Sequence, residues 1–158
     1  MKSMKWLVWA MAASLLAACA KPSPENKVVL DAQGSWRSVG KLHGGNMEVF
    51  YDTGSLQKQG NTVSLRSRLV VRDTDKEPYL ETPHFKIAVN EWQMNCRGNT
   101  VRVTSSHFFD SKKQLLAKHE YGAQDTAAAK PQPDTPAQSL WQAACRTPSR
   151  PTPSRASI

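Results

Sequence analysis

The stretch WQMNCRGNTVRVTSSHFF, residues 92–109, indicates a β-hairpin. Gly98-Asn99 is a two-residue turn signal between two runs in which apolar and polar side chains alternate. A two-residue turn at this point places the apolar side chains of both runs on one face, because the side-chain period of a strand is two. The expected cross-strand pairs are Cys96–Val101, Met94–Val103 and Trp92–Ser105.

Alternation of the same kind extends the sheet on both sides of this hairpin. Two upstream runs have apolar residues at odd-numbered positions. They are Met47, Val49 and Tyr51 in the first run, and Val63, Leu65, Leu69 and Val71 in the second. Gly54 and Gly60 are turn signals between these two runs. Downstream, residues 114–121 predict a further strand with Leu115, Ala117 and Tyr121 on the core face.

A short helix is expected after the last strand. Pro136 fits a helix start, and the apolar side chains of Leu140, Trp141 and Ala144 follow at helical spacing. We expect this helix to cover the sheet, with Trp36 and Trp141 as core anchors. The predicted fold class is α+β, with a small antiparallel meander of about five to six strands and a C-terminal helix.

The N-terminus has the pattern of an export signal. Lys2 and Lys5 precede a short apolar run, and Leu-Ala-Ala-Cys ends at Cys19. This ending resembles the lipobox of bacterial lipoproteins, in which the signal is removed before a cysteine that is then acylated. We therefore expect residues 1–18 to be a signal peptide and Cys19 to carry acyl chains such as palmitate that anchor the protein to a membrane. The alternative is an ordinary signal with a cysteine there by chance.

The odd number of cysteines fits this interpretation. With Cys19 lipidated, Cys96 and Cys145 are left as a possible disulfide pair in an oxidising compartment. Two free buried thiols are the alternative. A disulfide would join the predicted hairpin to the predicted helix.

Composition divides the chain further. Residues 19–35 contain Pro22 and Pro24 and are expected to form a lipidated tether. Residues 36–146 are expected to form the folded domain, with a loop over residues 125–136 before the helix. Residues 147–158 are rich in Pro, Ser and Arg and are expected to be disordered.

Charge argues against nucleic acid as a partner. The formal net charge of the full chain is +8, and the signal would remove Lys2 and Lys5 from it. Such a mildly basic exported chain is suited to anionic partners on a membrane or a protein. The candidate binding residues are Arg66, Arg68, Arg72, Arg102, Lys112 and Lys113. A solvated face whose charges guard the strands against aggregation is the alternative.

Asp52-Thr53-Gly54-Ser55 matches the catalytic motif of aspartic proteases. Those enzymes need two carboxylates that share one proton, so a single copy would require a dimer. The structural interpretation is a strand end where Asp52 accepts backbone hydrogen bonds within a turn. The histidines His43, His84, His107 and His119 lack the spacing of metal ligands, and no cofactor is predicted.

Several short motifs together resemble the surface-adhesin protein E family of Gram-negative lipoproteins. They are Trp36, Tyr51-Asp52 followed by Gly54-Ser55-Leu56, the strand from Val63, Met94-Asn95-Cys96, Phe108-Phe109-Asp110, and Pro136 with Ser139 and Cys145. The resemblance covers about residues 35–146. It implies a small antiparallel sheet with helical flanks, one disulfide, and display at the outer membrane.

The resemblance also gives the expected function. The named member of the family binds host matrix and serum proteins such as vitronectin and laminin, so this chain is expected to be a non-enzymatic, adhesin-like lipoprotein of the cell envelope. A structural or assembly lipoprotein facing the periplasm, with a bacterial partner, is the first alternative. An aspartic-type hydrolase using Asp52 is the second. The sequence does not define an oligomeric state.

Overall fold

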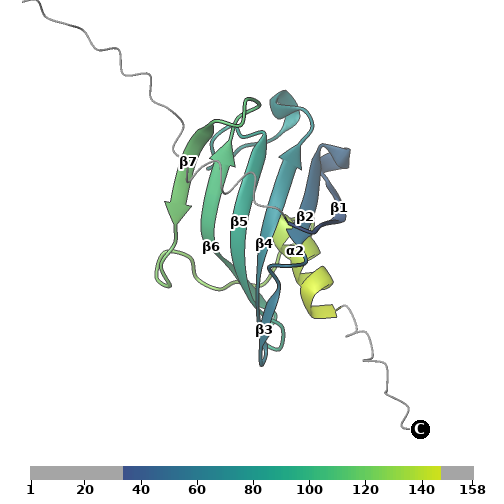
Figure 1. Ribbon diagram of the computed structural model, residues 1–158, viewed down its shortest axis with the longest axis vertical. Coiled ribbons are helices and arrows are strands. Elements are labelled where there is room, and N and C mark those ends of the chain that lie inside the picture. Colours follow the sequence, from purple (N-terminus) through teal and green to yellow (C-terminus); the bar gives the residue numbers. More distant parts are fainter. Residues whose placement is uncertain (1–33, 147–158) are drawn as a thin grey trace, which may run out of the picture.

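The structure is a computed structural model that describes residues 34–146 (Figure 1). Its strands form one antiparallel sheet in the order β1-β2-β4-β5-β6-β7, and β3 pairs with β4 beside this path. The path follows chain order apart from the short β3, which lies between β2 and β4 in sequence, so the predicted meander and the α+β class are confirmed. The strands are β1 (Trp36–Leu42), β2 (Met47–Asp52), β3 (Gln57–Gln59), β4 (Thr62–Val71), β5 (Ile87–Asn95), β6 (Thr100–Phe109) and β7 (Leu115–Glu120).

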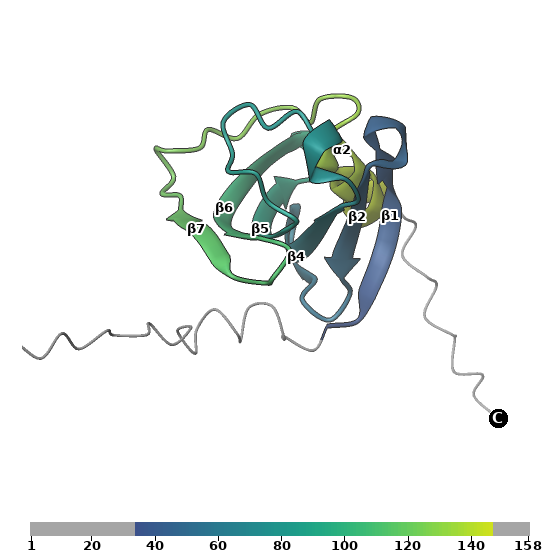
Figure 2. The same ribbon diagram turned by 90° about the horizontal axis from the view of Figure 1, so that it is seen from above.

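The sheet curves around the C-terminal helix and two long loops, which lie on its concave side (Figure 2). The core lies between them. On β4, Val63, Leu65, Leu69 and Val71 are all buried, as their alternation predicts. Met47, Val49 and Tyr51 on β2 extend the same core. Apolar side chains on one face of each strand therefore give the sheet its covered concave side.

The helix α2 (Pro136–Trp141) is short and is defined at its start by local chemistry. The Thr135 hydroxyl accepts a hydrogen bond from the Gln138 amide at 3.3 Å, and Pro136 occupies the first turn, where its missing N–H costs nothing. Leu140 and Trp141 are buried against the sheet. A wider turn over Gln142–Arg146 continues α2.

A disulfide joins Cys96, just after β5, to Cys145, just after α2, with a sulfur–sulfur distance of 2.01 Å. The predicted pairing is therefore confirmed. Both half-cystines pack against the core cluster. The bond holds the last helical turn against the tip of the β5–β6 hairpin.

The predicted register of this hairpin is wrong by two residues. Asn95 pairs with Thr100 and Met94 with Val101, so residues 96–99 form a four-residue turn. The Asn95 side chain accepts a hydrogen bond from the Gly98 amide at 2.8 Å, and Asn99 adopts a left-handed conformation with φ 51°. From Asn95 to Trp92, this shift of two residues leaves the side chains on their predicted faces.

A β-bulge then changes the pairing further along the hairpin. Glu91 pairs with Ser105 and Trp92 with Val103, so Thr104 is an extra residue on β6. The predicted pair of Trp92 with Ser105 is therefore absent. Trp92 and Val103 lie on the concave face, whereas Glu91 and Ser105 lie on the convex face.

The predicted role of Trp36 as a core anchor is also wrong. Trp36 is half-buried on the convex face, because β1 pairs it with Asp52 rather than with a core position. Trp141 is 7% exposed and is a core residue as predicted.

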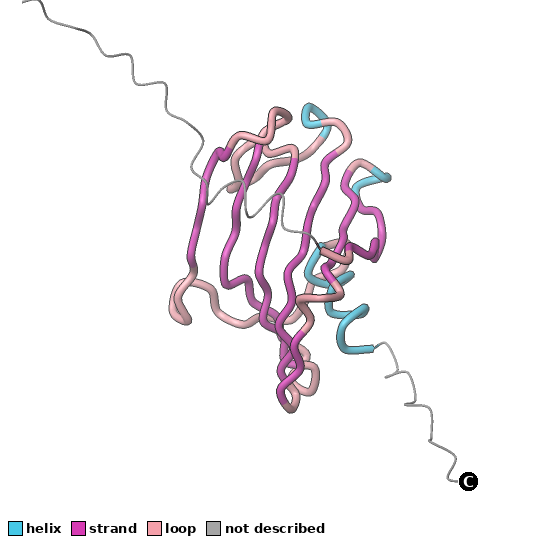
Figure 3. The backbone as a smooth tube through the Cα atoms, viewed as in Figure 1, coloured by secondary structure: helices cyan, strands magenta, loops and turns pink. Residues whose placement is uncertain are grey.

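Two 3-10 turns, His43–Gly45 and Thr74–Lys76, lie at the same end of the sheet (Figure 3). The Asn46 side chain connects the segments that contain them. It donates to the Asp73 carbonyl at 3.0 Å and accepts from the Asp73 amide at 3.0 Å. The loop after β4 is thereby tied to the turn between β1 and β2.

The predicted signal peptide, the predicted lipidation site Cys19 and the predicted C-terminal tail lie outside the described residues, as does nearly all of the predicted tether. Among residues 34–146, no helix has the length and apolar character needed to cross a bilayer.

Candidate functional site

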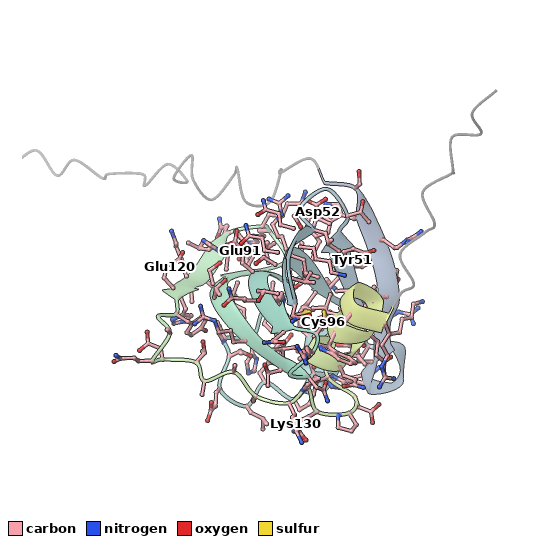
Figure 4. All side chains as sticks on the ribbon, turned by 90° about the horizontal axis from the view of Figure 1, so that it is seen from below. Tyr51, Asp52, Glu91, Cys96, Glu120 and Lys130 are labelled. Carbon is pink, nitrogen blue, oxygen red and sulfur yellow. A yellow bond between two sulfur atoms is a disulfide. The ribbon has the colours of Figure 1, made fainter. Side chains whose placement is uncertain are left out.

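A polar groove lies on the convex face of the sheet, opposite the helix. Its volume is about 580 Å³. Figure 4 shows Asp52 and Glu91 on this face, while Tyr51 and Cys96 lie on the side of the helix. The principal polar side chains in its lining are those of Asp52, Ser55, Ser64, Arg66, Glu91 and Gln93.

Asp52 is the most buried acidic group of the groove, at 3% exposure. Its Oδ1 accepts hydrogen bonds from the amides of Ser35 and Gly54, each at 3.0 Å. Its Oδ2 accepts a hydrogen bond from the Arg66 guanidinium at 2.5 Å. Burial raises the pKa of Asp52, but the bonds from Arg66, Gly54 and Ser35 and the charge of Arg66 outweigh it, and the pKa lies below its usual value.

The turn that follows Asp52 fixes this geometry. The Ser55 amide donates to the Asp52 carbonyl at 3.0 Å, and the Ser55 hydroxyl donates to the same carbonyl at 2.8 Å. The Arg66 amide in turn donates to the Ser55 hydroxyl at 2.8 Å. The Asp-Thr-Gly-Ser sequence thus forms the predicted turn, in which Asp52 accepts backbone hydrogen bonds.

Two arginines of β4 gather on one aromatic ring. The guanidinium carbon of Arg68 lies 4.2 Å from the centre of the Trp36 ring, and that of Arg66 lies 5.6 Å from it. Burial lowers the pKa of Arg68, as does the charge of Arg66, while Asp52 opposes both effects. One terminal nitrogen of Arg66 donates a hydrogen bond to Asp52. The Arg66 Nε is buried and has no hydrogen-bond partner among the described residues.

The other predicted basic residues lie in two further places. The Arg102 Nε donates to the Gln93 side chain at 2.8 Å, which places Arg102 at the border of the groove. Arg72 follows β4 and lines a separate hollow of about 620 Å³ near the 3-10 turns. Lys112 and Lys113 are exposed in the turn between β6 and β7. The structure therefore brings Arg66, Arg68 and Arg102 to one surface and leaves the other three at the opposite end of the sheet.

Acidic residues interrupt this basic surface. Glu91 is the cross-strand neighbour of Arg66, and Glu120 is the neighbour of Ser105. Besides Asp52, Glu91 is the other carboxylate that lines the groove within the described residues. An acid–base pair that shares a proton needs two carboxylates in contact, whereas Arg66 holds Asp52 as an ion pair.

Histidines and cysteines add no metal centre to the part of the chain that is described. Within residues 34–146, no three His, Cys, Asp or Glu side chains are grouped so as to hold a metal ion. His43 instead contacts Glu77, with 2.6 Å between Nδ1 and Oε1.

Sequence reasoning missed Glu91 and Gln93 as groove residues, and Trp36 as the ring that contacts Arg66 and Arg68 beside the groove. Trp36 was assigned to the core because large aromatic side chains are usually buried. Glu91 and Gln93 alternate with Trp92 and Met94, so the sequence does indicate that they face away from the core. Their position beside Arg66 and Arg102 follows only from the strand register.

Comparison with curated proteins and with solved structures found no match. A family model described as surface-adhesin protein E matches residues 36–146. That range spans all seven strands, the helix and both half-cystines. The chain therefore belongs to the surface-adhesin protein E family.

Proposed function

We propose that this protein is a lipid-anchored adhesin of the bacterial cell envelope that binds acidic segments of host matrix or serum proteins through the convex groove. Membership in a surface-adhesin family supports a binding role at the cell surface or envelope. The observation that carries the choice of site is the Arg66–Arg68 pair, stacked on Trp36 beside an open polar groove.

The chemistry of Arg66 supports an acidic ligand. A guanidinium has five N–H donors, and the Asp52 bond occupies one of them. The Arg66 side chain is 25% exposed, so its remaining terminal N–H groups can donate a charge-assisted hydrogen bond to a carboxylate or carbonyl that enters the groove. Trp36 holds the cations in place, which lowers the entropic cost of binding.

The anchor and the location are part of the same proposal. The Leu-Ala-Ala-Cys ending supports acylation of Cys19, and residues 20–33 then separate the lipid from the domain. The residue after Cys19 is Ala20 rather than Asp, which in enteric-type sorting favours the outer membrane. No nucleic acid and no cofactor enter the proposal.

Two substitutions that each change one charge test the groove without removing the Asp52–Arg66 pair. Glu91→Gln removes a like charge from the path of an acidic ligand and is expected to strengthen binding to immobilised laminin or vitronectin. Gln93→Glu adds such a charge and is expected to weaken it, by about two- to fivefold. Lys112→Gln at the far end of the sheet is the matched control and should leave affinity unchanged.

Affinity is measured by surface plasmon resonance at two salt concentrations, with melting temperature as the check on folding. The effects of Glu91→Gln and Gln93→Glu should shrink at higher salt, because exposed charges are screened. Equal affinities for all three variants would contradict the groove as the binding site.

Antibody labelling of intact and permeabilised cells tests the location. Labelling of intact cells supports the adhesin. Labelling only after permeabilisation would contradict host binding and favour a periplasmic structural or assembly role with a bacterial partner.

A further inference from the structure

A second hollow lies on the concave side of the sheet, opposite the groove. Its volume is about 440 Å³, within the range of about 300–1,000 Å³ that small-molecule sites occupy. Two segments border it, residues 77–85 and residues 121–136, and the sheet forms its floor. Most of the lining is apolar, including the side chains of Met47, Leu69, Phe85, Trp92, Val103 and Phe108.

The segment 77–85 is held in place at both ends. The Tyr79 hydroxyl donates to the Phe85 carbonyl at 2.5 Å, and the Phe85 ring lies 5.3 Å from the ring of Phe108 on β6. At the other end, the Glu77 carboxylate contacts His43 Nδ1 at 2.6 Å and accepts from Asn46 at 3.0 Å. The cavity is therefore formed in advance, which reduces the entropic cost of filling it.

The floor of the cavity holds two buried polar side chains. Asn90 and Ser106 are cross-strand partners on β5 and β6, and they are 5% and 4% exposed. Both side chains line the cavity, so their amide and hydroxyl groups border the space inside it.

Other buried polar groups near the cavity are satisfied. The Trp92 indole donates to the Ser67 hydroxyl at 2.7 Å, and the Thr126 hydroxyl donates to the Val103 carbonyl at 2.8 Å. Buried amides are normally hydrogen-bonded because leaving them unpaired is costly. The Asn90 amide and the Ser106 hydroxyl on the floor can therefore hydrogen-bond to a polar group of a molecule that enters the cavity.

The charges around the cavity select the ligand class. Glu77 and Glu81 are the ionisable carboxylates that line it, and no Lys, Arg or His side chain in the described chain lines it. Burial raises the pKa of Tyr79 to about 12, as do the charges of Glu77 and Asp75, so Tyr79 is neutral as well. An anionic ligand meets repulsion here, while a neutral one does not.

Leu80 lies at the solvent-exposed edge of the cavity. It lines the cavity and is 92% exposed, more than any other large apolar side chain of the described domain. An exposed leucine beside an apolar cavity gives an entering hydrocarbon chain a first contact.

From this geometry we propose that the concave cavity binds one uncharged, mostly apolar molecule that carries a single hydrogen-bonding group, of the class of long-chain alcohols and monoacylglycerols. The hydrocarbon part fills the space between Phe85, Trp92 and Phe108. The hydrogen-bonding group meets the Asn90 amide and the Ser106 hydroxyl. This site is on the other face from the proposed adhesive groove and does not depend on it.

The test uses the mature chain, residues 19–158, with Cys19→Ser so that no acyl chain competes for the cavity. The neutral fluorophore N-phenyl-1-naphthylamine is titrated first, and one saturable site per chain is expected. 1-Dodecanol should then displace it at a concentration about tenfold lower than dodecanoate, because a carboxylate on the cavity floor is desolvated and no cationic side chain of the described residues lines the cavity. The absence of saturable binding, or equal displacement by the two competitors, would overturn the proposal.

Variants locate the site. Asn90→Leu should lower the affinity for 1-dodecanol by about five- to tenfold. The affinity for the fluorophore should change by less than about twofold. Leu116→Ser is the matched control on an exposed position outside the cavity and should change neither. If Asn90→Leu loses its near-UV circular dichroism, Ser106→Ala serves in its place. An equal loss of affinity for 1-dodecanol in the variant of Asn90 or Ser106 and in the Leu116→Ser control would also overturn the proposal.

Discussion

Replacing Cys96 with serine removes the cross-link between the β5–β6 turn and the last helical turn. The two cysteines are 49 residues apart in sequence. In the chain-entropy model, a closed loop of that length stabilises the fold by about 4 kcal/mol. For a domain of this size, 4 kcal/mol corresponds to a decrease in melting temperature of about 15 °C.

Thermal unfolding followed by circular dichroism measures this decrease under oxidising conditions. Cys145→Ser is expected to have nearly the same effect, because either change removes the same bond. The double variant should melt close to the single ones, because the bond can be lost only once. Cys19→Ser is the control and should melt with the parent domain.

Two results would refute the reasoning. One is a large difference between the two single variants, which would mean that side-chain packing rather than the cross-link sets their stability. The other is a double variant that loses the sum of the two single effects. Adding reductant to the parent protein should lower its melting temperature to that of the variants.

Three further predictions concern the helix and the groove. Leu140→Ala is expected to lower the free energy of unfolding by about 2–5 kcal/mol in urea denaturation, because Leu140 is fully buried, whereas exposed Leu116→Ala should change it by less than about 0.5 kcal/mol. Thr135→Ala removes the helix cap and should lower the free energy of unfolding by about 1 kcal/mol in the same assay. Thr135→Ser keeps a hydroxyl at the cap and should retain most of the parent stability. The pKa of Asp52 is lower in the folded chain, so its ion pair stabilises the fold above the ordinary carboxylate pKa and less as pH falls through the folded value. The stability difference between the parent and Asp52→Asn should therefore be widest above about pH 5 and narrow towards pH 2 in denaturation series; a constant difference would contradict the ion pair.

The sequence was a good guide to the sheet because burial follows a strict alternation. The apolar positions of β2 and β4 and the helix start at Pro136 could all be located from period and local chemistry. The register of the central hairpin could not, because Asn95 closes a four-residue turn that the Gly98-Asn99 pair does not distinguish from a two-residue one. The bulge at Thr104 on β6 could not be located either, because the residues around it, Thr104 to Ser106, are all small and polar.

The candidate groove was only partly predictable. Arg66 and Arg68 were identified from their positions on one face of a strand, and Asp52 from its turn motif. Their contact across β2 and β4, and the placement of Trp36 over both arginines, depend on strand pairing at long sequence distance. The concave cavity lies under the loop 77–85, whose sequence has no periodicity to place it over the sheet.

The meander order has a consequence for how the chain acquires its structure. The strands pair along the sheet in chain order, with only the short β3 beside the path, so the sheet can grow hairpin by hairpin with little loop closure at each step. The helix comes last and contacts β1 and β2, the first strands of the domain. Docking of the helix thus joins the two ends of the domain and brings Cys145 to Cys96. Oxidation of this pair is a late folding event that marks a completed domain, and a chain that stops before Pro136 would leave the apolar concave face open to chaperones and proteases.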